Sequence, residues 1–199
     1  MRRIAVIAVL LLVSLPGSAK EGDELLGTAA PEWRGVVWAR GGPYTLAGLH
    51  GKVVLVRWWT VGCSMCLASA PALDELQQKY GSKGLVVVGM FHPKPPRAVT
   101  AKEVRDWADR VGIRCPVAID ADWALLRRYW LDGHDRAFTS VSFLIDQQGR
   151  IRYVHPGGEF HGPPDPPYPA PDGDRQHHAC HQAYREMEAL IGEMLKGGK

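Results

Sequence analysis

The sequence lacks an excess of charge of either sign. Its 24 Lys and Arg residues are nearly balanced by 21 Asp and Glu residues, which gives a formal net charge of +3. Without Arg2 and Arg3, which we assign to a leader below, the net charge is about +1. A charge this small provides no electrostatic footprint for nucleic acid or for an anionic membrane. We therefore expect neither as a partner.

A membrane-spanning apolar run is also missing. The longest apolar stretch, Ile4–Leu15, follows two arginines and precedes the small residues Gly17 and Ala19. About a dozen residues are too few to span a bilayer as a stable anchor, and this order is typical of a secretory signal peptide. We predict a signal peptide over residues 1–19, cleavage before Lys20, a periplasmic location, and no stable membrane insertion after cleavage. An uncleaved membrane anchor is the alternative.

Cysteines are few, and they do not suit a disulfide scaffold. A chain with 46% hydrophobic residues can bury a core without cross-links, so the four cysteines call for another role. Cys63 and Cys66 form a C-x-x-C pair, whereas Cys115 and Cys180 stand alone. In an oxidising compartment Cys115 and Cys180 can bond to each other. We expect two separate thiols instead.

The order of apolar segments predicts an α/β fold. Residues 53–59 and 85–91 are β-branched, aromatic and apolar, which is typical of buried central strands. Further strands are predicted at 116–119, 141–145 and 150–155, the last two joined by a turn at 146–149. A small hairpin over 36–46 is predicted at the N-terminal entry.

Helical spacing separates these strands. Apolar residues recur at intervals of three and four over 73–80, 104–111 and 183–194, and a short helix is predicted near 123–130. Strands that alternate with helices form a mixed sheet covered on both faces. We expect one domain over 20–160. Residues 161–199, a Gly- and Pro-rich loop followed by a helix, are expected to pack on the same domain.

The segment Trp58-Trp59-Thr60-Val61-Gly62-Cys63-Ser64-Met65-Cys66 resembles the thioredoxin superfamily. In particular it is similar to exported TlpA/ResA-like thiol–disulfide reductases and to the thioredoxin-like domains of DipZ-type proteins. The resemblance extends roughly from Pro31 to Gly158 and includes Pro71 and the Phe-Leu-Ile-Asp run at 143–146. It implies a thioredoxin-like fold, a central mixed sheet flanked by helices, with an N-terminal β extension and a C-terminal loop plus helix.

The same resemblance implies a protein-disulfide oxidoreductase, in the family usually a reductase, that works without a cofactor. Its partners would be protein thiols and disulfides and an upstream membrane or periplasmic electron donor. Residue chemistry supports this independently. A Cys63 sulfur that faces the first N–H groups of a helix is stabilised as a thiolate, which lowers its pKa from about 8.5 toward neutrality. Cys66, one turn further and more buried, is positioned to resolve a mixed disulfide.

Three departures from the thioredoxin pattern surround this pair. Ser140 stands where thioredoxins have a cis-proline, and a non-proline cis bond costs about 2.5–4 kcal/mol, so we predict a trans Thr139–Ser140 peptide. The Ser140 hydroxyl can hydrogen-bond the Cys63 thiolate. Arg57 replaces a buried acid. It either favours thiolates electrostatically or pairs with a carboxylate. Gly62 replaces a tryptophan, which leaves Cys63 more open.

Ser64 and Met65, the two residues between the cysteines, are neither charged nor proline. We expect them to tune the redox potential of the pair. The candidate catalytic residues are therefore Cys63, the nucleophile, and Cys66, the resolving thiol. The substrate-groove and tuning candidates are Arg57, Gly62, Ser64, Met65, Thr139 and Ser140. No metal site is assigned.

Other readings of the cysteine pair are a structural disulfide, half a zinc site, a peroxiredoxin-like peroxidase and a copper chaperone. For a peroxidase, Thr60 fits the expected threonine and Arg136 can supply a cation, but Val56 occupies the place of the required proline. For copper, His134 or His155 can add a nitrogen to two thiolates. The tail histidines and cysteine, typical of an exposed solvated turn, are a further possible metal cluster: His161, His177, His178, Cys180 and His181.

Overall fold

The computed structural model describes residues 20–162 and 175–197. The predicted signal peptide and most of the predicted Gly- and Pro-rich loop lie outside these ranges. None of the helices within them is long and apolar enough to cross a membrane.

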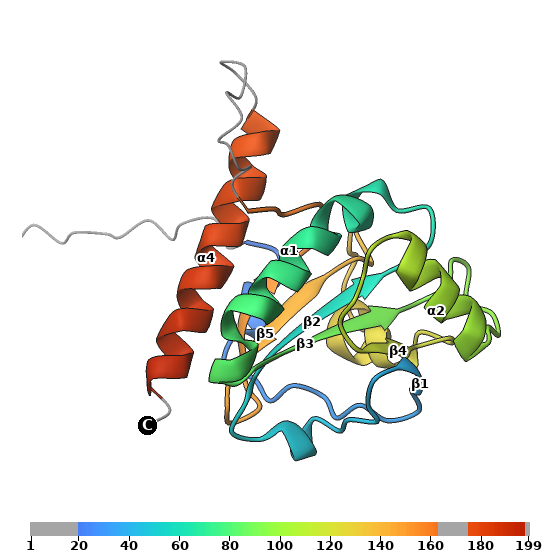
Figure 1. The fold of residues 1–199 in the computed structure, drawn as a ribbon, viewed down its shortest axis with the longest axis horizontal. Coiled ribbons are helices and arrows are strands. Elements are labelled where there is room, and N and C mark those ends of the chain that lie inside the picture. The colour runs from blue at the N-terminus through green and yellow to red at the C-terminus, as the bar shows by residue number, and fades with distance from the viewer. Residues whose placement is uncertain (1–19, 163–174, 198–199) are drawn as a thin grey trace, which may run out of the picture.

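A six-stranded mixed sheet forms the centre of the described chain, in the order β1-β4-β3-β2-β5-β6 (Figure 1). Strands β2, β3 and β4 are parallel, while β5 runs antiparallel to β2 and β6 antiparallel to β5. This sheet confirms the predicted thioredoxin-like fold class. The strands are β1 (Val37–Arg40), β2 (Val53–Trp59), β3 (Leu85–Phe91), β4 (Val117–Ile119), β5 (Ser142–Ile145) and β6 (Ile151–His155).

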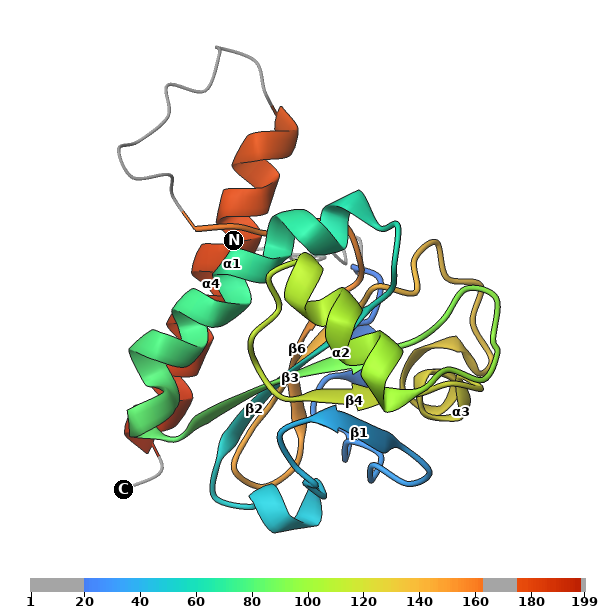
Figure 2. The same cartoon turned by 45° about the vertical axis from the view of Figure 1, so that its right-hand side comes forward.

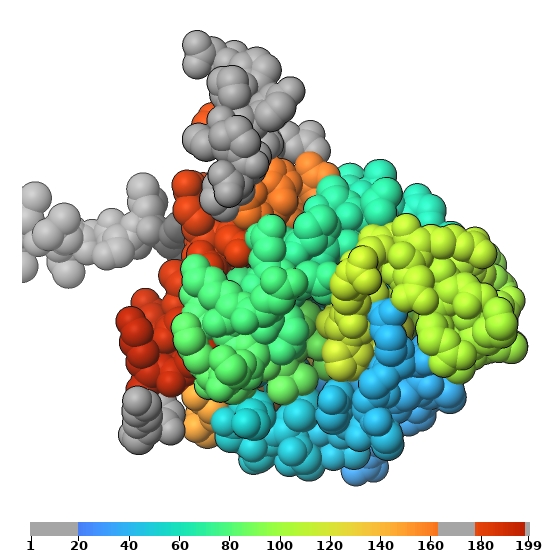
Figure 3. Space-filling model, viewed as in Figure 1, coloured from blue at the N-terminus to red at the C-terminus, as the bar shows by residue number. Residues whose placement is uncertain are grey.

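Helices cover both faces of the sheet. α1 (Ser64–Tyr80), α2 (Ala101–Arg110) and α4 (Arg175–Gly197) lie on one face, and Figure 3 shows α4 directly against α1. The short α3 (Ala124–Leu126) and the π-helical turn Arg127–Leu131 pack on the other face with the N-terminal segment (Figure 2). Because both faces are covered, every residue of β2 is buried.

The hairpin predicted over 36–46 is wrong. Its first part is β1, which pairs antiparallel with the edge of β4 and places Trp38 opposite Ala118. Gly41 and Gly42 then adopt positive φ angles of 62° and 73°, which turn the chain away. Tyr44 lies outside any strand, and its ring meets that of Trp38 edge-on. The open edge of β4 therefore provides the partner strand that the sequence pattern assigned to 44–46.

The remaining elements agree with the sequence pattern to within a few residues. The segments predicted at 53–59 and 85–91 are β2 and β3, and α1 ends where Gly81 follows it. The predicted apolar face of the last helix packs on the core, with Met187 and Ile191 fully buried. Consequently the end of β2 and the start of α1, where the cysteine pair lies, are held on a rigid frame.

Candidate active site

Cys63 and Cys66 form a disulfide at the junction of β2 and α1, with their Cα atoms 5.2 Å apart. Cys63 is the N-cap residue of α1, and the backbone N–H of Cys66 donates to Cys63 Sγ at 3.1 Å. The Cys63 sulfur therefore faces a backbone donor in the first turn of α1, as predicted. Cys66 is buried with 4% of its surface exposed, whereas Cys63 is half-buried. A partner thiol thus reaches Cys63 first.

Gly62 has a conformational role that the sequence comparison with tryptophan did not reveal. Its φ angle is +78°, and a Cβ atom built on it would meet nothing within 4 Å. Space therefore does not exclude a side chain here, but the left-handed backbone disfavours one. Gly62 makes the turn between β2 and the cap of α1. The path beside Cys63 is open, as predicted.

Ser140 lies against both sulfurs. Its hydroxyl oxygen is 3.2 Å from Cys66 Sγ and 3.6 Å from Cys63 Sγ, and the residue is buried. The Thr139–Ser140 peptide is trans, as predicted. Thr139 Oγ1 lies 2.9 Å from Nε2 of His92, the residue after β3. The loop before β5 is thereby fixed beside the disulfide, at the place where thioredoxins have their proline.

Arg57 is fully buried in β2, on the side of the sheet that faces α1. It donates to Ser142 Oγ at 3.2 Å and to the carbonyl oxygen of Gly158 at 2.7 Å, while its Nε has no hydrogen-bond partner among the described residues. Its guanidinium lies 5.3 Å from the centre of the Phe160 ring. Burial lowers the pKa of Arg57 to about 9, so it stays charged at neutral pH. No described carboxylate forms an ion pair with Arg57, which contradicts the pairing alternative.

Two buried histidines accompany this cation. Burial and the positive charges of Lys94 and Arg57 lower the pKa of His92 to about 3. Burial and Arg57 lower the pKa of His155 to about 3 as well. Both imidazoles are consequently neutral at physiological pH. Arg57 is then the permanent positive charge of this part of the core.

The surface around the disulfide is apolar. A hollow of about 230 Å³ opens beside Cys63 and is bordered by Trp59, Thr60, Leu67 and Val111. Three large hydrophobic side chains near the cysteine pair in the sequence or on the loop before β5 remain exposed. They are Val61, Leu67 and Phe138, which are 48%, 51% and 42% exposed. Apolar exposure of this kind is typical of a surface that meets another protein.

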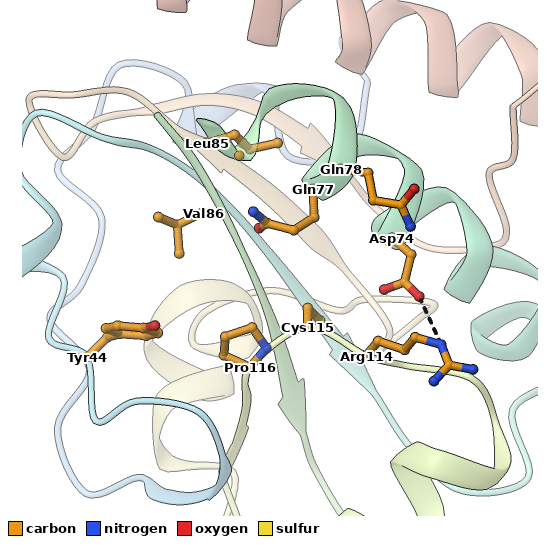
Figure 4. Close-up of a pocket in the computed structure, with 10 residues that line it drawn as sticks. Tyr44, Asp74, Gln77, Gln78, Leu85, Val86, Arg114, Cys115 and Pro116 are labelled. Carbon is orange, nitrogen blue, oxygen red and sulfur yellow. Dashed lines mark ion pairs between the residues drawn. The ribbon is translucent and has the colours of Figure 1, made fainter. Parts of the chain in front are cut away.

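The other two cysteines do not form a disulfide with each other, as predicted. Cys115 lines a hollow of about 500 Å³ beside the ion pair of Asp74 and Arg114 (Figure 4). This hollow adjoins the first residues of β3 and the residue before β4, at the opposite end of the parallel strands from the disulfide. Burial and the negative charge of Asp74 raise the pKa of Cys115 to about 12. Its thiol is therefore inert at neutral pH.

Comparison with known proteins shows which family the chain belongs to. The family model described as Redoxin matches residues 25–167. The chain belongs to the Redoxin family. This Redoxin chain is 32% identical over 139 residues to protein DipZ of Mycobacterium bovis, an alignment that covers 66% of the chain but only 19% of DipZ. It is 28% identical over 126 residues to thiol-disulfide oxidoreductase ResA of Bacillus thuringiensis, which covers 63% of the chain and 66% of ResA.

Solved structures agree with the fold. A thiol:disulfide interchange protein of the thioredoxin family from Chlorobium tepidum superposes with a TM-score of 0.58 at 21% identity, over 85% of this chain and 97% of that one. The predicted resemblance to thioredoxin-like, ResA-like and DipZ-type proteins is thus confirmed. The Redoxin chain spans a small part of DipZ, whose remaining length has no counterpart in the alignment.

The peroxidase and copper alternatives gain no support from the described geometry. Val56, at the place of the peroxidase proline, is paired with β3 and β5 in mid-strand. Arg136 is paired with Glu24 and lies over the Trp130 ring. His134 faces the same Glu24, and neither His134 nor His155 is grouped with the cysteine pair among the described candidate metal ligands.

Sequence reasoning missed the residues that enclose Arg57: Ser142, Gly158 and Phe160. Ser142 was part of a predicted strand, and Phe160 was one residue of a predicted loop. The available signal was a phenylalanine in a stretch of Gly, Pro and Asp, which favours an anchoring contact. In the structure Phe160 is fully buried, and its N–H donates to Ser69 Oγ of α1 at 3.1 Å.

Proposed function

We propose that this Redoxin chain is a periplasmic thiol–disulfide oxidoreductase that reduces disulfides of partner proteins through Cys63 and Cys66. The observation that carries the proposal is the position of Cys63: an accessible sulfur at the N-cap of α1, bonded to a buried Cys66. Relatives that bear the name thiol-disulfide oxidoreductase, among them ResA and YkuV, support the reaction class.

The reaction begins with the reduced pair. The Cys63 thiolate attacks one sulfur of a partner disulfide, the partner's S–S bond breaks, and the other partner sulfur leaves as a thiolate that takes up a proton. Cys66 then attacks Cys63 Sγ, which releases the second partner sulfur and closes the Cys63–Cys66 bond. Two electrons have passed to the partner. An upstream dithiol donor must supply two electrons to reopen the pair.

Several features around Cys63 stabilise its thiolate. The Cys66 N–H and the dipole of α1 stabilise its thiolate, and the Ser140 hydroxyl is within reach of both sulfurs. The charge of Arg57, which no described carboxylate neutralises, favours the anionic dithiol over the disulfide. The exposed side chains of Val61, Leu67 and Phe138 offer apolar, sequence-tolerant contacts for unfolded or extended partner segments.

A trapping experiment tests the proposal. In a Cys66→Ala variant the mixed disulfide on Cys63 is not resolved, so covalent complexes with periplasmic proteins should accumulate and dissolve on addition of dithiothreitol. A Cys63→Ala, Cys66→Ala double variant should trap none, and Cys115→Ala should behave as wild type because Cys115 is buried. Absence of trapped partners, with peroxide consumption by the reduced wild type, would favour the peroxidase alternative instead.

Localisation needs a separate measurement. When the full chain is expressed in a Gram-negative host, we expect it in the osmotic-shock fraction. Its mass should correspond to a chain that begins at Lys20. Retention of residues 1–19 in a membrane fraction would support the uncleaved anchor.

A further inference from the structure

A second group of reactive side chains lies where the segment after β6 meets the beginning of α4. Glu159, His161 and Cys180 each offer one ligand atom, and these atoms all lie within 4.8 Å of one another. Within residues 20–162 and 178–197, no other trio of His, Cys, Asp or Glu side chains is close enough to share an ion. Cys180 is buried, with 5% of its surface exposed, so the exposed turn predicted for it is wrong.

The spacing fits a tetrahedral ion. Cys180 Sγ lies 3.6 Å from Glu159 Oε1. In a tetrahedral zinc site with bonds of about 2.0–2.3 Å, neighbouring ligand atoms are about 3.3–3.8 Å apart. The observed distance therefore matches one edge of such a site. The His161 ligand nitrogen lies within 4.8 Å of the ligand atoms of both Glu159 and Cys180.

The donor set selects the metal. Thiolate, imidazole and carboxylate are all ordinary ligands of Zn²⁺, whereas a carboxylate is a poor ligand for Cu(I), and Mg²⁺ or Ca²⁺ favour oxygen ligands. The imidazole of His181 stands beside that of His161, with ring centres 4.4 Å apart, and offers a nitrogen as a fourth ligand. We propose that Glu159, His161 and Cys180 bind one Zn²⁺ ion, with His181 beside them as a further donor.

The position of this site indicates a structural clamp. Glu159 and His161 flank Phe160, whose N–H is bonded to Ser69 of α1 and whose ring lies over Arg57. Cys180 belongs to α4, which packs against α1. One ion would therefore fasten α4 to the loop that encloses Arg57. Binding requires a deprotonated Cys180 and a neutral His161, so it should weaken at acidic pH.

Cobalt substitution tests the proposal directly. The untagged full chain is kept oxidised, so that Cys63 and Cys66 are bonded to each other and cannot ligate. Titration with Co²⁺ should give one bound ion per chain, a thiolate-to-cobalt charge-transfer band and the intense visible bands of tetrahedral Co²⁺. Zn²⁺ should displace the cobalt and abolish these bands.

Matched cysteine variants assign the ligand. Cys180→Ser should lose the thiolate band, and His161→Ala or Glu159→Gln should weaken binding by about tenfold or more. Cys115→Ser should keep the wild-type titration, because Cys115 lines the hollow beside Asp74 and Arg114 and is not part of this group. Near-ultraviolet circular dichroism establishes that each variant is folded.

Thermal unfolding provides an independent readout. Zinc should raise the unfolding midpoint of the wild type and of Cys115→Ser, but not that of Cys180→Ser. The proposal is wrong if no thiolate band appears, or if the band persists in Cys180→Ser. Either result is distinguishable from failure of the oxidoreductase proposal, which depends on Cys63 and is measured by disulfide exchange.

Discussion

The Ser140 hydroxyl oxygen lies 3.2 Å from Cys66 Sγ and is also within 3.6 Å of Cys63 Sγ. In the reduced protein this hydroxyl can donate to whichever sulfur carries the charge. Ser140 thus offers a hydrogen bond where thioredoxins offer a proline ring.

Ser140→Ala should raise the pKa of the Cys63 thiol by about one unit, because a hydrogen bond to a charged group contributes about 1.5 kcal/mol or more and one pKa unit corresponds to about 1.4 kcal/mol. The ultraviolet absorbance of the thiolate, followed against pH in the reduced protein, measures this. Ser82→Ala, an exposed serine after α1, is the control. An unchanged pKa in Ser140→Ala would show that the hydroxyl does not bond the thiolate.

Arg57→Met should make the pair more reducing. Removal of the buried positive charge destabilises the thiolate form relative to the disulfide, so the reduction potential should fall by about 30 mV, which corresponds to about 1.4 kcal/mol for two electrons. Equilibration with a glutathione redox buffer measures the potential. Arg57→Lys keeps the charge and should retain most of the wild-type value. Equal shifts in both variants would indicate a packing effect instead.

Gly62→Ala should destabilise the protein by about 1 kcal/mol, since an alanine at a φ angle of +78° is strained even in open space. Gly192→Ala is the matched comparison. Gly192 lies within α4 and also has nothing near its Cβ position, but its backbone is helical, so alanine there should stabilise by about 0.5–1 kcal/mol. Urea unfolding measures the change in the free energy of unfolding of both variants. A change of the same sign in Gly62→Ala and Gly192→Ala would contradict this expectation.

The buried histidines should make the protein less stable as the pH decreases. The native state holds His92 and His155 neutral down to a pKa of about 3, while in the unfolded chain they titrate near 6.5. Between these values the unfolded state binds more protons, so unfolding becomes more favourable as pH decreases. Each histidine contributes up to about 1.4 kcal/mol per pH unit.

A His155→Phe variant separates the contribution of His155 to this pH dependence from that of His92. The substitution keeps an aromatic ring against Phe160, which lies 5.2 Å from the imidazole. Urea unfolding at pH 7, 6 and 5 should show a shallower pH dependence than in the wild type, by up to about 1.4 kcal/mol per pH unit. A parallel pair of curves would mean that His155 binds protons equally in the native and unfolded states, so that burial does not lower its pKa.

The local patterns in the sequence predicted the frame well. Central strands such as β2 and β3 are continuous apolar runs, and their bounds follow from composition and the glycines around them. The C-x-x-C pair was also predictable, because a strand, a turn and a helix start can be recognised within about ten residues. Ser140 was found through the family resemblance rather than through its own pattern.

Non-local contacts were not predictable in the same way. β1 pairs with β4, about eighty residues away, and no local pattern distinguishes that edge from a hairpin. Arg57 reads as an isolated charge in an apolar strand, and its partners Ser142 and Gly158 are brought to it only by the pairing of β5 with β2 and by the loop after β6. In the sequence Cys180 resembles part of a polar turn, but in the structure it lies in α4, on the buried side of the helix.

The reacting sulfur of Cys63 is itself the N-cap acceptor of α1. Thermodynamic linkage makes this relationship reciprocal: whatever the helix contributes to the thiolate, the thiolate contributes to the helix. The oxidised and reduced forms therefore differ in how firmly the first turn of α1 is held. The amide proton of Cys66, which points at that sulfur, becomes a natural reporter, and its exchange with solvent should slow when the pair is reduced and Cys63 is ionised. The redox state of the protein is thus readable from the backbone of one residue.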